Sequence, residues 1–326
     1  MKRFLVFLLF LATPILAKPL VVQNVSILED SVKEIAGDEV EVAKPLVVTS
    51  FSILGDMVKE IAGDKVEVKS LVEPNQDPHV FEPRPQHAKD LARADLVVVN
   101  GLGFEGWLDR LISASGFQGD LLVATTGVTP LMHAHHHTHH AHHDHGVFDP
   151  HAWHSLKNAP IYIDNIVEGL SRLVPEEASF FKARAAAYKK EVEVLEAQTH
   201  EELDHLPVES KKVLTNHEAF GYLGHDFQIV FYSPLGISTE SEPSAKAVAT
   251  LIDRIKKDKI QAVFVENISN SRLVERIAEE TGTQVGGILY SDALDVPGTQ
   301  ADTYLKMMRF NLNSLVKSMR KNAEVK

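Results

Sequence analysis

The tripeptide Asp-Pro-His occurs twice, at residues 77–79 and again at residues 149–151. Proline fixes its own φ angle and stiffens the chain, so the histidine after it is presented with little freedom. The preceding aspartate can accept a hydrogen bond from the backbone or from an imidazole N–H, which fixes the tautomer of a metal-bound histidine. A single motif would be read as a simple turn. Because both share one local pattern, we interpret His79 and His151 as metal ligands.

Two further candidates follow predicted strands. His217 comes after the strand KKVLT, and Asp292 comes after the strand VGGIL. Ligands of open parallel sheets bind at the carboxyl ends of the strands. Each residue alone is a weak signal, since loops commonly carry histidine and aspartate. Two candidates come from each half of the chain, however, so facing lobes would place four ligands around one ion.

Three imidazoles and one carboxylate favour Zn²⁺ over Ca²⁺ or Mg²⁺, which prefer shells of oxygen. Manganese prefers more carboxylate. Four protein ligands leave no open coordination position, so the pattern predicts binding and not catalysis. The chain has no cysteine, which excludes thiolate ligands and nucleophiles, and it has neither G-x-S-x-G nor H-E-x-x-H. A metallohydrolase with an open zinc site is the alternative from another class.

A histidine-rich tract occupies residues 133–145. It has no apolar face that could pack, so we predict a loop. One interpretation is an accessory, low-affinity metal collector or sensor, and the other is a solvated tract without a role. We favour the accessory role for its nine histidines, which are His133, His135, His136, His137, His139, His140, His142, His143 and His145.

The segment Gly101–Gly106 matches the dinucleotide-binding pattern G-x-G-x-x-G. That interpretation also needs an acidic residue at the end of the next strand, and the next strand, LLVATT, ends in threonines. We therefore expect these glycines to shape a turn into the following helix.

The elements that must position the ligands alternate between strand and helix, which predicts parallel sheets covered by helices. Predicted strands in the first half are Leu46–Thr49, Val66–Leu71, Asp95–Asn100 and Leu121–Ala124, and those in the second half are Lys212–Thr215, Gln228–Tyr232, Gln261–Glu266 and Gln284–Leu289. Residues 175–205 have no glycine and no proline after Pro175, which predicts a helix roughly 45 Å long. We predict an α/β fold of two lobes, 44–174 and 206–326, each a parallel sheet flanked by helices, joined by this one long rigid helix.

The N-terminus reads as a signal peptide over residues 1–17, with Lys2 and Arg3 before a short apolar run. Residues 18–43, a strand-helix-strand segment, recur nearly unchanged as 44–69, and we take the second copy as the working element. The formal net charge of −12 and the lack of a long basic run argue against nucleic acid. Without cysteine there is no site for a bacterial lipid anchor, so we expect a monomer in the periplasm.

The motifs DPHVFEP, DPHAWHS, TNHEAFGYL and YSDAL together resemble the metal-binding receptors of bacterial zinc and manganese ABC transporters, the zinc-uptake type in particular. The resemblance covers about residues 44–320. It implies two lobes joined by one long helix, an ion held by His79, His151, His217 and Asp292, and delivery to an inner-membrane permease.

The third motif separates the subtypes of this family. Manganese members are similar to S-E-G there, whereas this chain has Asn216-His217-Glu218, and a histidine-rich loop is also typical of zinc members. The copy at 18–43 departs from the family pattern and leaves the placement of the first strand open. The alternatives are a manganese or iron receptor of the same family and an extracellular metal buffer or adhesin.

Overall fold

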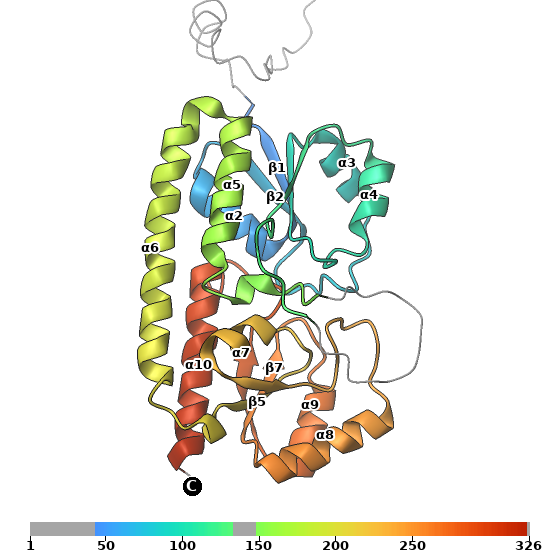
Figure 1. Cartoon of the computed structure of the whole chain (residues 1–326). Coiled ribbons are helices and arrows are strands. Elements are labelled where there is room, and N and C mark those ends of the chain that lie inside the picture. Colours follow the sequence, from blue (N-terminus) through green and yellow to red (C-terminus); the bar gives the residue numbers. More distant parts are fainter. Residues whose placement is uncertain (1–42, 133–147, 325–326) are drawn as a thin grey trace, which may run out of the picture. The chain divides into compact units, whose positions relative to one another are not determined.

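The computed structural model describes residues 43–132 and 148–324. The predicted signal peptide, the first copy of the repeat apart from Ala43, and the histidine-rich tract lie outside these described residues. The unit Leu46–Lys326 holds every named element. In chain order (Figure 1) these are β1 (Leu46–Phe51), α2 (Ser52–Ala62), β2 (Glu67–Val72), α3 (Pro85–Arg93), β3 (Leu96–Val99), α4 (Leu108–Ser115), β4 (Asp120–Val123), α5 (Ala159–Leu173), α6 (Ala178–Leu203), β5 (Lys212–Leu214), α7 (Gly221–Phe227), β6 (Val230–Tyr232), α8 (Ala245–Asp258), β7 (Ala262–Glu266), α9 (Arg272–Thr281), β8 (Val285–Leu289) and α10 (Tyr304–Glu324).

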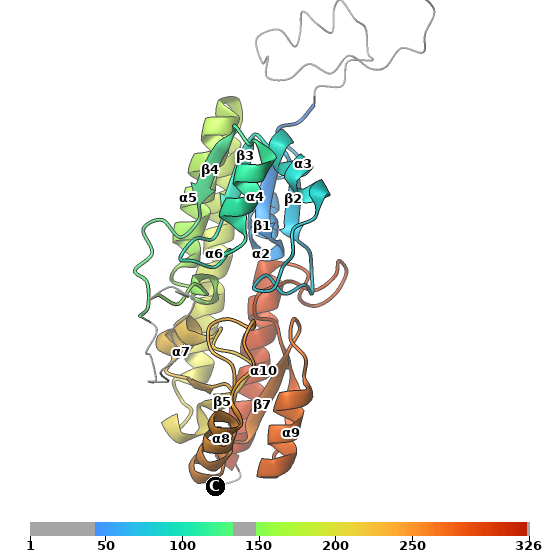
Figure 2. The ribbon, with the colours of Figure 1, turned by 90° about the vertical axis from the view of Figure 1, so that its right-hand side faces the viewer.

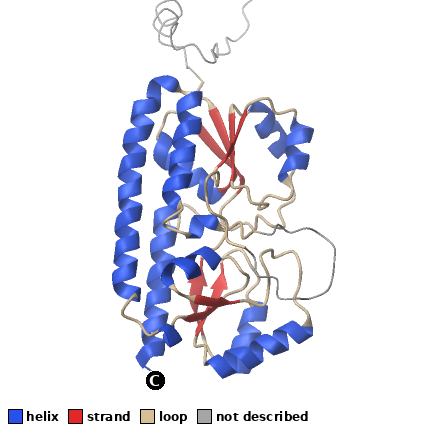
Figure 3. Ribbon diagram, in the orientation of Figure 1, coloured by secondary structure: helices blue, strands red, loops and turns tan. Residues whose placement is uncertain are grey.

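Two four-stranded parallel sheets form the two lobes (Figure 3). Their strand orders are β2-β1-β3-β4 and β6-β5-β7-β8, so the same topology is used twice. In each sheet the direction of winding reverses beside the first strand, between β1 and β3 in one lobe and between β5 and β7 in the other. Ligands of doubly wound sheets bind at such reversals. The predicted fold class is confirmed.

Helices cover both faces of each sheet, as parallel sheets require. In the N-terminal lobe α2 packs with α5 on one face, and α3 packs with α4 on the other. In the C-terminal lobe α8 packs with α9, while α10 packs on β7 and β8. Figure 2 shows α4 and α8 in front of the sheets and α6 behind them. The central strand β1 is therefore buried along its whole length.

The long helix α6 buries one side from end to end. Its buried residues recur every three or four positions, which places them on one face, and they are Phe181, Ala185, Tyr188, Val192, Leu195, Thr199 and Leu203. This face packs on α2, α5 and α10, so the helix is attached to both lobes. The α-helix proper is shorter than the predicted 175–205, because Pro175–Glu177 form a 3-10 turn before it.

Helices α5 and α7 were not predicted from the sequence. Helix α5 is rich in isoleucine and valine, which favour strands by intrinsic propensity. Its buried residues Tyr162, Ile163, Ile166 and Leu170 nevertheless follow helical spacing. Packing of this face on β3, β4 and α6 overrides the local preference.

One hydrophobic cluster runs through both lobes. It includes Phe51 and Trp153 from the N-terminal half and Phe220 and Leu294 from the C-terminal half. A smaller cluster lies between the C-terminal sheet and helices α8 and α9. Because interiors are closely packed, a shared core resists wide hinge motion of one lobe against the other. Within residues 43–132 and 148–324, no helix combines the length and apolar character that a membrane span needs.

Candidate metal centre

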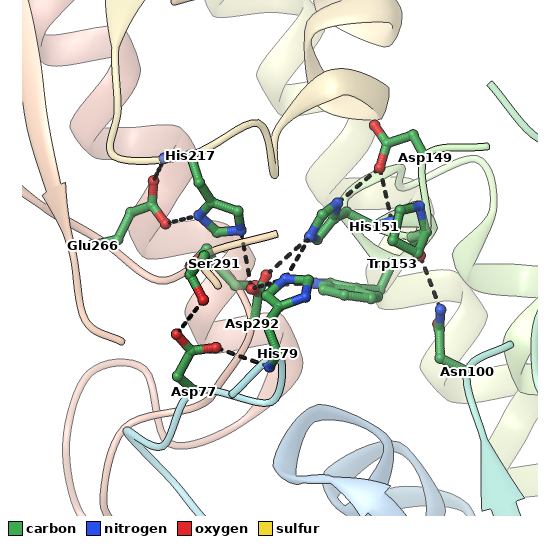
Figure 4. A network of polar contacts seen from close by, with 12 residues as sticks. Asp77, His79, Asn100, Asp149, His151, Trp153, His217, Glu266, Ser291 and Asp292 are labelled. Carbon is green, nitrogen blue, oxygen red and sulfur yellow. Dashed lines mark hydrogen bonds and ion pairs between the residues drawn. The ribbon is translucent and has the colours of Figure 1, made fainter. Parts of the chain in front are cut away.

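Four side chains converge between the two sheets (Figure 4). The Nε2 atoms of His79 and His217 each lie 3.1 Å from Oδ2 of Asp292, and Nε2 of His151 lies 3.6 Å from Oδ1. The Nε2 atoms of His79 and His151 are 3.4 Å apart. One ligand atom from each of the four residues lies within 4.8 Å of all the others. These are the four residues that the sequence predicted.

The sheets explain this convergence. His79 follows β2 and His151 follows β4, whereas His217 follows β5 and Asp292 follows β8. All four therefore stand at the carboxyl ends of parallel strands, and each lobe contributes two of them. The two sheets turn these edges toward each other, which brings residues far apart in sequence to one point.

The spacing suits a small tetrahedral ion. Zinc–nitrogen bonds of about 2.0 Å give a tetrahedron whose edges measure about 3.3 Å. The closest distances from the Asp292 carboxylate to the imidazoles, 3.1 to 3.6 Å, bracket that edge. The side chains of His151, His217 and Asp292 are 0% exposed and that of His79 is 5% exposed, so an ion here is shielded from bulk water.

Several of the converging atoms lack a hydrogen bond. Among the described residues, Nε2 of His217 and both oxygens of Asp292 are buried without a hydrogen-bond partner. Buried polar atoms without partners are costly and rare. A cation would satisfy all three atoms at once, so the donor set fits a metal ion.

A second carboxylate orients His217. Oε2 of Glu266 contacts Nδ1 of the imidazole, and Oε1 accepts the backbone N–H groups of Asn216 and His217 at 2.7 and 2.9 Å. A carboxylate only accepts hydrogen bonds, so Nδ1 carries the hydrogen and Nε2 keeps its lone pair toward the centre. This arrangement fixes the ring and raises its basicity as a ligand.

The two Asp-Pro-His motifs differ in their hydrogen bonds. Asp149 accepts both the backbone N–H of His151 at 2.9 Å and its ring Nδ1 at 2.8 Å, so it orients the imidazole. Asp77 accepts the backbone N–H of His79 at 2.9 Å but does not bond the ring. Its second oxygen accepts the hydroxyl of Thr239, from the other lobe, at 2.6 Å.

The charges of the centre interact strongly. Burial lowers the pKa of His217, but the carboxylates of Glu266 and Asp292 outweigh burial and raise that pKa well above its ordinary value. Burial raises the pKa of Asp292, yet His217 and His151 outweigh it and hold that pKa well below its usual range. Burial lowers the pKa of His79. The centre therefore keeps Asp292 as an anion.

Aromatic side chains form one wall of the centre. The ring of Trp153 lies 5.3 Å from that of His151 and 4.8 Å from that of Phe104. Its Nε1 donates to the carbonyl of Ser291 at 3.1 Å, which ties the N-terminal lobe to the residue before Asp292. Trp153 thus links the packing of the core to the position of a ligand.

The glycine-rich segment Gly101–Gly106 forms a turn. Glu105, within it, accepts the backbone N–H groups of Asn100 and Gly101 at 2.6 and 3.1 Å and the hydroxyl of Ser50 at 2.7 Å. Backbone N–H groups that would hold a phosphate in a dinucleotide site are thus bonded to the chain itself.

Glu266, Trp153 and Thr239 were not identified from the sequence. Glu266 ends strand β7, next to the strand that leads to His217, so its place at a strand end was an available signal. Trp153 and Thr239 offered no comparable signal. Each acts through a contact with a residue on the other lobe.

Replacing Glu266 by glutamine should weaken ion binding by about 10- to 100-fold. One oxygen and one amide cannot accept from both the backbone N–H groups and the ring of His217. The pKa of His217 should also fall, because its main raising charge is lost. The raised pKa makes wild-type binding tighten with rising pH, as the ion displaces the proton, so this dependence should flatten.

Calorimetric titration between pH 6 and 8 measures both effects. Glu279→Gln, an exposed change on α9, serves as the matched control. Wild-type affinity in the Glu266→Gln variant would show that Glu266 has no part in binding.

Comparisons with known proteins agree on one family. The family model described as "Zinc-uptake complex component A periplasmic" matches residues 47–318. The manganese-binding lipoprotein MntA of Bacillus subtilis (strain 168) is 30% identical over 78% of this chain and 82% of its own length. The iron-binding protein YfeA of Yersinia pestis is 32% identical over 77% of this chain and 78% of its own.

Solved structures share the fold. The periplasmic zinc-binding protein TroA of Treponema pallidum has a TM-score of 0.78 and 29% identity, covering 85% of this chain and 99% of that one. A manganese-bound periplasmic metal-binding protein of candidatus Liberibacter asiaticus has a TM-score of 0.76 and 29% identity, covering 85% of this chain and all of that one.

Proposed function

This chain belongs to the periplasmic zinc-uptake component A family, and we propose that it captures Zn²⁺ and delivers it to an ABC transporter permease in the inner membrane. The family consists of metal-binding components of ABC transporters and not of enzymes. Among the relatives are proteins named for manganese, iron and zinc, so the choice of zinc rests on this chain's own residues.

The observation that supports zinc is the donor set. Three imidazole nitrogens and one carboxylate face a common point, with Glu266 and Asp149 bonded to the far nitrogens of His217 and His151. Zinc accepts such a four-coordinate set, whereas manganese favours more oxygen ligands. His79, His151, His217 and Asp292 are the ligands that we propose.

The place of action that we propose is the periplasm, reached by a signal peptide at residues 1–17 that is removed. The relatives from Bacillus and Streptococcus are named lipoproteins. The sequence contains no cysteine, so their form of attachment is not transferred to this chain. We also propose that the protein acts as a monomer and that the tract 133–145 has an accessory role in metal binding.

Titration of metal-free protein tests the choice of metal. We expect one Zn²⁺ per chain to bind at the centre and to displace Mn²⁺ completely when the two ions are present in equal amounts. The measurement is calorimetry with each ion alone, followed by elemental analysis after competition. Retention of Mn²⁺ in that competition would favour the manganese receptor instead, and the absence of tight binding by either ion would refute the proposal.

A further inference from the structure

The segment Ser233–Ser244, between β6 and α8, joins two of the proposed ligands. At its base, the N–H of Leu235 donates to the carbonyl of Asn216 at 3.2 Å, and the carbonyl of Gly236 accepts from Glu218 at 3.0 Å. These bonds fix the segment to the residues on either side of His217. Its base is therefore part of the C-terminal half of the centre.

The tip of the same segment contacts the other lobe. The hydroxyl of Thr239 donates to Oδ2 of Asp77 at 2.6 Å, and Oδ1 of Asp77 accepts the backbone N–H of His79 at 2.9 Å. From its own lobe, the His79 loop is held by Trp107, whose Nε1 donates to the carbonyl of Pro78 at 2.9 Å. Thr239 supplies the corresponding bond from the opposite lobe.

His79 differs from the other imidazoles. Carboxylates contact the ring Nδ1 of His151 and of His217, whereas Asp77 bonds only the backbone of His79. The side chain of His79 is also the one ligand side chain with measurable exposure, at 5%. Its position therefore depends on how its loop is held more than on a bond to its ring.

A cavity of about 660 Å³ opens onto His79. The N-terminal lobe lines it with residues that include Phe81, Glu82 and Arg110, and the segment 233–244 lines it with Ile237, Ser238 and Glu240. Among the four ligands, only His79 borders this cavity. The side of the centre that an ion can reach from the cavity is thus bounded by the segment whose tip carries Thr239.

We propose that the hydrogen bond from Thr239 to Asp77 is an interlobe latch, which holds His79 on the ion and sets the rate at which the ion leaves through this cavity. Thr239 is a positioning residue in this mechanism, because it touches neither the ion nor a ligand side chain. The inference rests on the proposed capture of a divalent ion.

Replacing Thr239 by valine in the full chain should speed Zn²⁺ dissociation about tenfold, which is the effect of losing one hydrogen bond to a carboxylate. Thr239→Ser keeps the hydroxyl and should restore the wild-type rate. Stopped-flow mixing of zinc-loaded protein with excess chromogenic chelator measures these rates. Thr250→Val is the matched control, because that hydroxyl donates to Lys246 within its own helix.

A double-variant cycle guards against a general loss of structure. Asp77→Ala should also accelerate dissociation, and Thr239→Val should add nothing in its background, since the bond is already absent. A Thr239→Val rate within about twofold of wild type, a fast Thr239→Ser variant, or additive effects in the cycle would overturn the latch alone. Failure of the wild-type protein to take up one Zn²⁺ would overturn the proposed function as well.

Discussion

Replacing Asp292 by asparagine should weaken Zn²⁺ binding by at least about 100-fold. Four-ligand zinc sites have apparent binding free energies of about 10–16 kcal/mol, so one ligand contributes on the order of 3 kcal/mol, or about two powers of ten. Asp292 contributes more than an average share of charge, since it is the one anion among the four ligand side chains. Asparagine has nearly the same shape, so the backbone after β8 should keep its course.

Competition against a chelator of known zinc affinity measures this loss. Asp253→Asn, an exposed change on α8, is the matched control and should bind as the wild type does. Binding of Asp292→Asn within about threefold of wild type would mean that the ion is held without this carboxylate. The ligand set would then have to be revised.

Replacing Trp153 by alanine should lower the free energy of unfolding of the metal-free protein by about 3–5 kcal/mol. Trp153 is fully buried, and its ring lies 4.9 Å from that of Phe51 and 4.8 Å from that of Phe104. The substitution leaves a cavity in the core that the two lobes share. It also removes the donor to Ser291, so binding at the neighbouring Asp292 should weaken.

Urea denaturation of the metal-free protein tests the first effect, and zinc titration tests the second. Trp153→Phe separates the two causes, because it keeps most of the ring volume and loses only the N–H. That variant should lose about 1 kcal/mol of stability. A cost below about 1 kcal/mol for Trp153→Ala would show that this part of the core does not depend on the indole.

The sequence alone determined the local features of this protein. Alternating strand and helix patterns predicted eight strands, and all eight are present with ends shifted by a few residues. The four proposed ligands were recognisable because each is a metal-binding residue type placed after a strand or beside a proline. These signals are local, since the backbone period and the position of a loop depend on neighbouring residues.

Tertiary structure alone decided which distant groups support those ligands. Glu266 lies 49 residues from His217, Ser291 lies 138 residues from Trp153, and Thr239 lies 162 residues from Asp77. None of these pairs is marked by spacing or by residue type, because the distance between them depends on how two sheets and a shared core pack. The sequence thus carries the ligands on strand ends, and the facing of the two lobes supplies the bonds that hold them.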